Sequence, residues 1–382
     1  MSTARLSIIL LFICTSAYGE SRNPFRPLFN GRNLDGWVRV NTAPSTWSVR
    51  DGMIICTGKP IGVLRTTRMY QNFIMEVEWR HLEPAGNAGI FLWADDITAR
   101  GQPFHRGVEV QILENAYGNT RSYTTHGDIF PIHGATMTPV NSRGGSRAFP
   151  TENRSRPSPQ WNHYRITCND GKITLAVNGK TVTRGLDSSP RKGYICLESE
   201  GGIVHYRKLN IQELPATPIK PDQIAIADRG YQSLYTGTDF SGWKLPHSQK
   251  KLWESRDWIL HFGGEATESK ATLETEKSFR DFGFIFDVRI TKQTKPCKIF
   301  LRGSNQAVIT LAPAIHTRFL NTENGMEWNR LEGSLRDHTL NVSINGNPIF
   351  VNQTLTDLPD HGPLEIKPTG TIEFANIFVK PL

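Results

Sequence analysis

The chain contains little cysteine and no Cys-x-x-Cys pair. Five of its 382 residues are cysteine, and the first of them lies in an apolar N-terminal segment. The other four are Cys56, Cys168, Cys196 and Cys297. They are too few for a disulfide framework in a chain of this length, and their spacing excludes a zinc-thiolate site. We predict buried core thiols, with one disulfide within the first half as the alternative.

The chain also lacks blocks of one charge sign and long apolar runs. Its 44 Lys and Arg residues are interspersed with 36 Asp and Glu residues, although the formal net charge is +8. This pattern predicts a solvated surface and no nucleic-acid partner. No apolar run is long enough to span a bilayer. With 38% hydrophobic and 10% aromatic residues, the composition excludes a disordered chain.

Residues 1–19 are typical of a secretory signal peptide. Arg5 supplies a positive start, residues 6–14 are apolar, and small residues precede a cleavage point before Glu20. The apolar run is too short for a membrane-spanning helix of the mature chain. We therefore expect a secreted or periplasmic protein.

An internal repeat dominates the rest of the sequence. The pattern LFNGRNLDGW at 28–37 reappears as LYTGTDFSGW at 234–243, and WSVRD at 47–51 reappears as WESRD at 253–257. Three shorter matches keep the same order: IFL at 90–92 and 299–301, WN at 161–162 and 328–329, and VNG at 177–179 with ING at 344–346. The preserved order predicts a duplicated unit.

A proline-rich segment separates the two copies. Pro215, Pro218 and Pro221 cannot continue a strand ladder and predict a semi-stiff connector. After the signal peptide, we therefore expect a first domain at 25–214, a linker at 215–230 and a second domain at 231–382.

Both copies show the sequence period of β-strands. Residues 73–80 and 163–168 alternate apolar and polar side chains, which is typical of half-buried strands. The pairs Asp170-Gly171 and Asn178-Gly179 supply the positive φ that tight hairpins need. No segment shows a helical stripe. We predict an all-β protein made of sandwiches or jelly rolls.

The two copies differ in one long insertion. Between the Ile-Phe-Leu strand and the Trp-Asn pair, the first copy has residues 93–160, and the second copy spans the same interval in less than half that length. The insertion carries many polar and aromatic side chains, among them His105, Tyr117 and Tyr123. This content favours a functional loop over a linker.

The sharpest local pattern in the insertion is the run from Glu109 to Glu114. On a strand Glu109 and Gln111 share one face, and a single bulge would bring Glu114 back to it. Two Glu at this spacing resemble the nucleophile and the acid/base of retaining laminarinase-type glycosidases, whose carboxyls lie about 5–5.5 Å apart. Gln111 stands where those enzymes carry Asp. The alternative is a solvated strand face.

A second polar group follows at residues 126–133. His126, Asp128 and His133 are close enough in sequence to hold a divalent metal, to act as general acids or bases, or to hydrogen-bond a sugar. We predict no cofactor, with a divalent metal at these residues as the alternative. Trp93 has Arg302 in its place in the second copy, so we predict that the Trp93 ring stacks on a sugar.

Taken together, several motifs of the first copy resemble the 3-keto-disaccharide hydrolase family. They are residues 28–37, Gly86-Asn87-Ala88-Gly89-Ile90-Phe91, Glu109-Val110-Gln111, Trp161-Asn162, Val177-Asn178-Gly179, Leu197-Glu198-Ser199-Glu200-Gly201-Gly202 and His205-Tyr206-Arg207. The resemblance covers 25–214 motif by motif and 231–382 only in skeleton. It implies two tandem concanavalin A-like jelly-roll sandwiches, of which the second is a degenerate copy.

The resemblance also implies a carbohydrate substrate, a glycoside whose glucose unit carries a ketone at C3. Such a ketone acidifies the proton on C2. A base removes this proton, the enolate expels the C1 substituent, and water adds afterward. The site then needs a base of raised pKa, donors for the enolate oxygen and an acid for the leaving group.

By this resemblance Glu109 is the base or the acid, and His126 or His133 is a second proton-transfer group. The remaining predicted site residues are substrate contacts: Asn87, Trp93, Gln111, Glu114, Asp128, Glu198 and Arg207. Trp93 stands where many members of the family carry Arg, and Glu198 stands where Gln is usual.

The second copy lacks these groups. Val308 aligns near Glu109, Thr310 near Gln111, and Lys295–Lys298 replaces residues 86–89. We expect this copy to pack or to contact carbohydrate without catalysis. Two other functions stay open for the whole chain, a non-catalytic carbohydrate-binding protein and a structural or adhesive surface protein. No Gly-x-Gly-x-x-Gly motif follows a strand, so a separate dehydrogenase would have to form the ketone.

Overall fold

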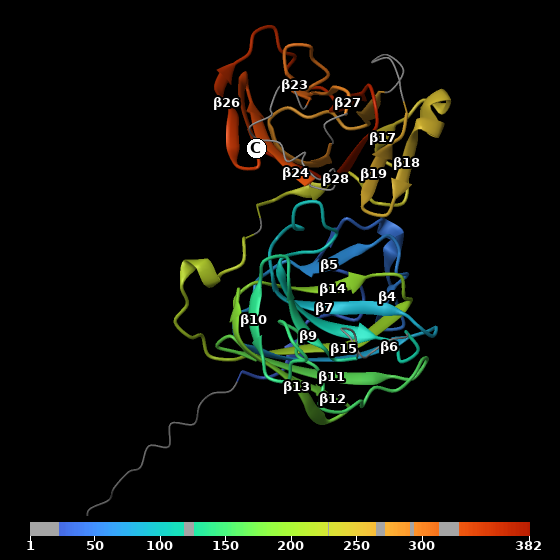
Figure 1. Cartoon of the computed structure of the whole chain (residues 1–382), viewed down its shortest axis with the longest axis vertical. Coiled ribbons are helices and arrows are strands. Elements are labelled where there is room, and N and C mark those ends of the chain that lie inside the picture. The colour runs from blue at the N-terminus through green and yellow to red at the C-terminus, as the bar shows by residue number, and fades with distance from the viewer. Residues whose placement is uncertain (1–22, 118–125, 228, 265–271, 291–293, 313–327) are drawn as a thin grey trace, which may run out of the picture.

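The structure is a computed structural model that describes residues 23–117, 126–227, 229–264, 272–290, 294–312 and 328–382 (Figure 1). In these ranges the chain forms strands and three short 3-10 turns, η1 (Pro44–Thr46), η2 (Pro221–Gln223) and η3 (His247–Leu252). The predicted all-β class is confirmed. The predicted signal peptide lies outside the described residues. None of the described helical segments is long and apolar enough to cross a membrane.

The strands of the first half form two antiparallel sheets that pack face to face, the first sandwich (Figure 1). Sheet A has the order β10-β13-β12-β11-β6-β15-β4-β3, with β1 beside β15. Its strands are β1 (Arg26–Pro27), β3 (Trp47–Arg50), β4 (Met53–Cys56), β6 (Phe73–His81), β10 (Thr136–Pro139), β11 (Asn162–Asn169), β12 (Lys172–Val177), β13 (Lys180–Ser189) and β15 (Val204–Glu213). Sheet B has the order β2-β5-β14-β7-β8-β9. Its strands are β2 (Trp37–Val40), β5 (Gly62–Thr66), β7 (Asn87–Ala94), β8 (Gly107–Leu113), β9 (Ile129–Ile132) and β14 (Tyr194–Ser199).

The strands of the second half form another pair of antiparallel sheets, the second sandwich. Sheet C has the order β18-β19-β28-β21-β24-β25-β26, with β16 beside β28. Its strands are β16 (Gln232–Ser233), β18 (Trp253–Arg256), β19 (Ile259–Phe262), β21 (Phe282–Arg289), β24 (Trp328–Arg336), β25 (Thr339–Ile344), β26 (Asn347–Thr354) and β28 (Ile372–Pro381). Sheet D has the order β17-β20-β27-β22-β23. Its strands are β17 (Trp243–Lys244), β20 (Leu273–Thr275), β22 (Cys297–Phe300), β23 (Val308–Leu311) and β27 (Glu365–Pro368).

The two sandwiches connect their strands in the same way. Sheet C follows the order of sheet A from β3 to β13, and sheet D follows the order of sheet B from β2 to β8. The repeated IFL motif lies on β7 in the first sandwich and at β22 in the second. Equivalent positions in the two sandwiches can therefore be read from the strand registers.

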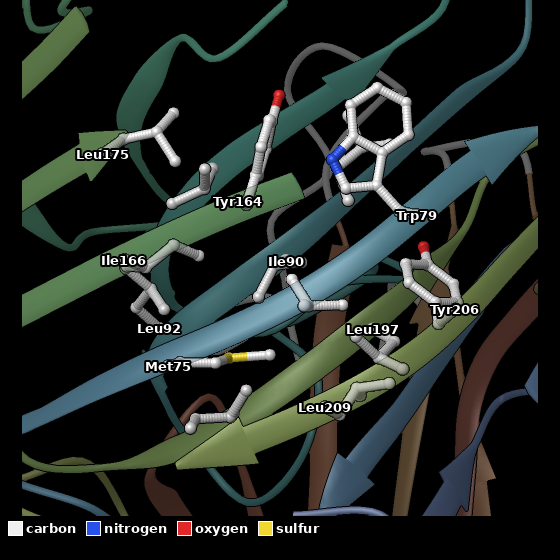
Figure 2. Close-up of a cluster of buried hydrophobic side chains, with 14 of the residues drawn as sticks. Met75, Trp79, Ile90, Leu92, Tyr164, Ile166, Leu175, Leu197, Tyr206 and Leu209 are labelled. Atoms are coloured by element: carbon white, nitrogen blue, oxygen red, sulfur yellow. The ribbon is translucent and has the colours of Figure 1, made fainter. Parts of the chain in front are cut away.

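Alternation along the strands builds the core of the first sandwich. In β6, Phe73, Met75, Val77 and Trp79 are buried, while the side chains between them are half-buried. Side chains of both sheets meet between the layers (Figure 2). Tyr164, fully buried on β11, donates its hydroxyl to the backbone oxygen of Gln111 on β8, 2.9 Å away. This bond ties the middle of β8 to the opposite sheet.

Turn chemistry explains the hairpins around β12. Asp170 and Gly171 have φ of 50° and 76°, and Asn178 and Gly179 have φ of 48° and 88°. Gly and Asn tolerate this left-handed region, so both turns predicted from sequence are confirmed. Four cysteines of the described chain are free and buried, which confirms the core thiols and rules out the predicted alternative of a disulfide.

The two sandwiches meet through the outer faces of sheets B and C. An apolar cluster joins them, and we call it the seam cluster. Its buried members are Val40, Val63, Phe91, Ala94, Ile97, Tyr194 and Cys196 from the first sandwich and Ile285 and Phe378 from the second. Ile285 and Phe378 point away from the core of their own sandwich, because that core is built from the alternate residues of β21 and β28.

The alternation of β11 makes a stability prediction. Replacing the fully buried Ile166 by Ala should lower the free energy of unfolding by about 2–5 kcal/mol, because it leaves a cavity between the sheets. Replacing its half-buried neighbour Thr167 by Ala should change it by less than about 0.5 kcal/mol. Urea denaturation followed by tryptophan fluorescence measures both values. Equal losses would contradict the inward and outward assignment of these two residues.

Candidate active site

The outer face of sheet B carries a group of polar side chains that point away from the core. On β8 the alternate residues Val108, Val110 and Ile112 face the core, so Glu109 and Gln111 face outward. Glu198 on β14 lies on the same outer face, although only 1% of it is exposed. Sheet B therefore brings together side chains that are far apart in the sequence.

Gly89 separates the two glutamates. Its strand, β7, lies between β8 and β14, and Gly89 pairs with Gln111. A Cβ atom at Gly89 would lie 2.7 Å from Oε1 of Glu109 and 2.9 Å from Oε2 of Glu198. The two carboxyls therefore face each other across a position where any side chain would displace them. Both stay close because residue 89 has no side chain.

A chain of amide hydrogen bonds leads to a third carboxyl. Gln111 donates from Nε2 to Oδ1 of Asn87 at 2.7 Å and to the backbone oxygen of Ala88 at 3.1 Å. Asn87 in turn donates from Nδ2 to Oε2 of Glu200. Both N–H bonds of Gln111 are used, whereas one N–H of Asn87 remains for another acceptor. This chain holds Glu200 beside the two glutamates.

Burial of three acids in one place raises their pKa values. Burial and the neighbouring Glu200 hold the pKa of Glu109 well above its ordinary range. Burial and the charges of Glu109 and Glu200 do the same for Glu198. Burial raises the pKa of Glu200 to about 7. Neighbouring carboxyls resist ionising together, so the cluster of three acids holds protons at neutral pH.

Among the described residues, Arg147 is the cation that acts on Glu109. It pairs with the fully buried carboxyl of Asp128 at 3.0 Å and lies over the ring of Phe130. The positive charge of Arg147 partly offsets the pKa rise at Glu109. Asp128 was predicted as a substrate contact, and this prediction is wrong: its carboxyl is sealed from solvent and holds Arg147 in place.

Glu114 does not belong to the cluster of Glu109, Glu198 and Glu200, which corrects its predicted role. Strand β8 ends at Leu113, and the Glu114 carboxyl accepts hydrogen bonds from the backbone N–H groups of Ala85, Ala116 and Ser158 at 2.7–2.9 Å. Burial works to raise the pKa of Glu114, but these N–H groups bring it below the ordinary value. Glu114 therefore joins three loop segments, and the laminarinase-like pairing with Glu109 is wrong.

Trp93 and Arg207 also lie away from the group. Trp93 is fully buried, donates from Nε1 to the backbone oxygen of Gln71 at 2.8 Å and packs against Phe73, so it cannot stack on a sugar. Arg207 lies on sheet A, where it pairs with Glu78 at 2.6 Å and covers the ring of Trp161. The core of the sandwich separates Arg207 from Glu109, so its predicted substrate contact is wrong.

The structure does not bring the two predicted histidines to the carboxyls. Nδ1 of His126 lies 3.1 Å from the backbone oxygen of Leu113, and His133 lies in the turn after β9. Burial lowers the pKa of both rings. Over the described ranges, neither ring has a hydrogen bond to Glu109, Glu198 or Glu200, and no group of three or more His, Cys, Asp or Glu is arranged to hold a metal ion.

Sequence reasoning missed Glu200, Gly89 and Arg147 as site residues. Glu200 could have been found from the strand period, because it follows Glu198 by two residues and so projects to the same side. Gly89 could be recognised only once β7 was placed between β8 and β14. Arg147 lies in the long insertion, where no period indicates its direction.

Equivalent positions of the second sandwich carry no such acids. Val308 pairs with Phe300 as Glu109 pairs with Phe91, so Val308 takes the place of Glu109. By the same registers Lys298 takes the place of Gly89, and Lys367 takes the place of Glu198. The cluster formed by Glu109, Glu198 and Glu200 is therefore a feature of the first sandwich.

Residues 24–212 match the family model of the 3-keto-alpha-glucoside-1,2-lyase-like domain. This match covers the first sandwich, which is the part of the chain that resembles the family. The three acids all lie in this lyase-like domain. A comparison with curated proteins finds no match.

Several solved structures resemble about half of this chain. Two crystal structures of candidate glycosyl hydrolases from Parabacteroides distasonis are 20% and 24% identical to it. They cover 50% of this chain and 94% and 100% of their own, with TM-scores of 0.39 and 0.38. The carbohydrate-binding module CBM66 from Bacillus subtilis is 10% identical, covers 47% of this chain and 96% of its own, and has a TM-score of 0.34.

The raised pKa of Glu200 makes a stability prediction. A carboxyl whose pKa is about 7 when folded and about 4.3 when unfolded stabilises the fold at low pH, and this contribution is lost as the pH rises through 7. Glu200→Gln removes the contribution and also lowers the pKa of Glu109 and Glu198. The free energy of unfolding should therefore fall less between pH 5 and pH 8 in the variant than in the wild type.

Urea denaturation at a series of pH values in this interval measures the difference. The matched control is Glu83→Gln, which makes the same change at an exposed position of the first sandwich. Its pH dependence should follow the wild type. Parallel curves for Glu200→Gln and the wild type would show that Glu200 titrates as an ordinary carboxyl.

Proposed function

We propose that the lyase-like domain cleaves 3-keto-glucosides by removing the proton on C2 and expelling the substituent on C1. The observation that carries this proposal is the pair Glu109 and Glu198, buried and facing each other across Gly89. In the part of the chain that the structure describes, neither carboxyl has an ion-pair partner. A carboxylate in such surroundings is a stronger base than an exposed one, which suits removal of a weakly acidic C–H proton near neutral pH.

In the first step the three coupled acids carry one negative charge, which lies on Glu109 in the reactive state, and Glu109 takes the proton on C2. The electron pair of the C2–H bond forms a C2=C3 double bond, and the carbonyl pair moves to the oxygen on C3. The remaining N–H of Asn87 and the guanidinium of Arg147 are the donors that would stabilise this oxyanion. Glu198 remains protonated during this step, because its neighbour carries the charge.

In the second step, the C3 carbonyl reforms, the enolate pair forms a C1=C2 double bond, and the C1–O bond breaks. The leaving oxygen takes a proton from Glu200, whose pKa of about 7 suits proton donation at neutral pH. The products are an unsaturated 3-keto sugar and a free alcohol. Addition of water across C1=C2 then gives 3-keto-glucose, and the net reaction is hydrolysis.

We also infer that the chain is exported and that the second sandwich is a non-catalytic copy. Residues 1–19 support export by their composition. Val308, Lys298 and Lys367 at the equivalent positions support the loss of catalysis, because none of them is an acid. We infer no resident cofactor: the ketone of the substrate supplies the activation that the mechanism needs.

The test compares a 3-keto-glucoside with its unoxidised parent, each with and without a chelator. We expect release of the alcohol from the keto-glucoside alone, and no effect of the chelator. Cleavage of the parent would indicate a conventional glycosidase. Cleavage of neither, with a sugar that still raises the melting temperature, would favour a non-catalytic carbohydrate-binding protein.

The role of Glu109 as the base predicts the effect of replacing it by glutamine. Glu109→Gln should lower kcat at least about 100-fold, because the amide cannot accept the C2 proton, and should leave substrate affinity within a small factor. Stopped-flow release of a chromogenic alcohol measures kcat, and calorimetry with the inactive variant measures affinity. The control Glu83→Gln should behave as the wild type. A loss of affinity with unchanged kcat would rule out Glu109 as the base.

The place of Gly89 between the two carboxyls predicts the effect of adding a side chain there. In Gly89→Ala the new methyl group pushes the flexible ends of Glu109 and Glu198 apart. We therefore expect kcat to fall at least about tenfold. The free energy of unfolding should fall by about 1–3 kcal/mol. The same kinetic assay and urea denaturation measure the two effects. An unchanged kcat would show that the spacing of the two carboxyls does not matter.

A further inference from the structure

The apolar seam begins directly beside the two glutamates. Residues opposite each other on antiparallel strands project to the same face. Phe91 is the partner of Glu109 and Val63 is the partner of Glu198, and both belong to the seam cluster. The second sandwich adds Ile285 and Phe378 to this cluster. The outer face of sheet B is therefore divided into an acidic part and a part that the second sandwich covers.

A buried carboxylate of the second sandwich holds the loop that leads into β8. Residues 95–106 join β7 to β8. Asp287 on β21 is fully buried and accepts a hydrogen bond from the backbone N–H of Gly101 at 2.7 Å. Arg330 donates to the same carboxylate from two nitrogens at 2.7 and 2.8 Å, and to the backbone oxygen of Thr98 at 3.1 Å.

Asn376 adds further bonds to the same loop. Its side-chain nitrogen donates to Asp287 at 2.7 Å and to the backbone oxygens of Ala99 at 2.9 Å and Gln102 at 3.2 Å. Its side-chain oxygen accepts from Asn41 at 2.6 Å. The second sandwich thus satisfies polar backbone groups of the loop that would otherwise need water or another partner.

The held loop packs onto the site strand. Phe104 in the loop makes an edge-to-face contact with Phe91, at 5.4 Å between ring centroids, and Phe91 is the register partner of Glu109. Arg106, just before β8, pairs with Asp95 at 2.9 Å and closes the base of the loop. A continuous path of contacts therefore runs from Asp287 through the loop to Glu109.

From these contacts we infer that the second sandwich is a positioning element of the catalytic site in the first: it holds loop 95–106 against sheet B and keeps water from the apolar side of Glu109 and Glu198. Asp287, Arg330 and Asn376 are its positioning residues. This inference rests on the proposed function, since it assigns the second sandwich a part in the same reaction. The second sandwich then has a function in this chain without binding sugar by itself.

Undocking of the second sandwich should change the proton affinity of Glu109 and Glu198. The groups that surround the two glutamates are Glu200 on their own face, Asp128 and Arg147 from the insertion, and Cys56 and Tyr206 from sheet A. Among the described residues, none of these groups belongs to the second sandwich, so undocking removes none of them. It admits water, which favours the ionised carboxyls. The acid limb of the pH–rate profile should then move to lower pH.

Two variants weaken the docking from opposite sides. The double variant Ile285→Ser with Phe378→Ser removes the apolar contact without emptying a core, because both side chains point out of their own sandwich. Gly101→Ala acts from the first sandwich, where a Cβ would lie 2.0 Å from the ring of Trp328 and φ is +68°. The control Val351→Ser changes an exposed apolar residue on β26 of the same sheet C.

Hydrogen–deuterium exchange, steady-state kinetics and titration of ¹³C-labelled glutamate carboxyls are measured on the full chain. We expect both docking variants to show faster exchange in residues 95–113, kcat reduced about 10- to 100-fold with a smaller change in KM, and carboxyl titration shifted to lower pH. The control should match the wild type in all three. Unchanged exchange would overturn the inference, and so would faster exchange with unchanged kcat and unchanged titration.

Failure of the proposed function gives a different result. If the wild type turns over neither the keto-glucoside nor its parent, the proposed reaction is wrong. The exchange and carboxyl titration still decide whether the second sandwich holds the loop and shields the two glutamates, because neither measurement needs turnover.

Discussion

Two acids buried side by side, neither of them paired with a cation of the described residues, are the constraint around which this site is built. Glu109 and Glu198 face each other over Gly89, and a single methyl group there would displace both. Burial favours the protonated form of each acid. The charge of Glu200 favours it further in Glu109, and the charges of Glu109 and Glu200 favour it further in Glu198. Such an arrangement costs stability at neutral pH, so the surrounding structure has to hold it in place.

The surrounding polar residues do this by fixing positions rather than by neutralising charge. Gln111 and Asn87 form a hydrogen-bonded chain that ends on Glu200, and Asp128 holds Arg147 at a distance where it acts on Glu109 without pairing with it. A direct ion pair would lower the pKa of Glu109 and weaken it in its proposed role as a base. The placement of Arg147 therefore matters as much as its charge.

Much of the fold could be predicted from the sequence because it depends on local patterns. Alternation placed β6 and β11, and the Asp-Gly and Asn-Gly pairs placed the turns on either side of β12. Glu109, Gln111, Asn87 and Glu198 were named as site residues, and the structure brings them to one face. The sequence does not show which strands are neighbours in sheet B, so Gly89 could not be placed between the two acids. Glu200 could have been found from the strand period, because it follows Glu198 by two residues, but it was missed.

The errors at Trp93 and Glu114 have local causes. Strict alternation from Phe91 would point Trp93 outward, but the register of β7 shifts there and Trp93 has φ of 54°, so the bulge turns its ring into the core. Glu114 was expected to return to the Glu109 face through a bulge. Instead β8 ends before Glu114, and its carboxyl accepts hydrogen bonds from backbone N–H groups of three loop segments. In both cases a backbone irregularity, which side-chain period alone does not reveal, decided the outcome.

The two sandwiches use different outer surfaces. The first copy uses the outer face of sheet B for its acids, and the second has Val308, Lys298 and Lys367 at the equivalent places. The second copy instead presents the outer face of sheet C, where Ile285, Phe378 and the Asp287 hydrogen bonds meet the first copy. A face that bears large apolar side chains such as Ile285 and Phe378 is unfavourable in water. Docking resolves this, and the surface it covers on the first copy begins at the residues paired with Glu109 and Glu198.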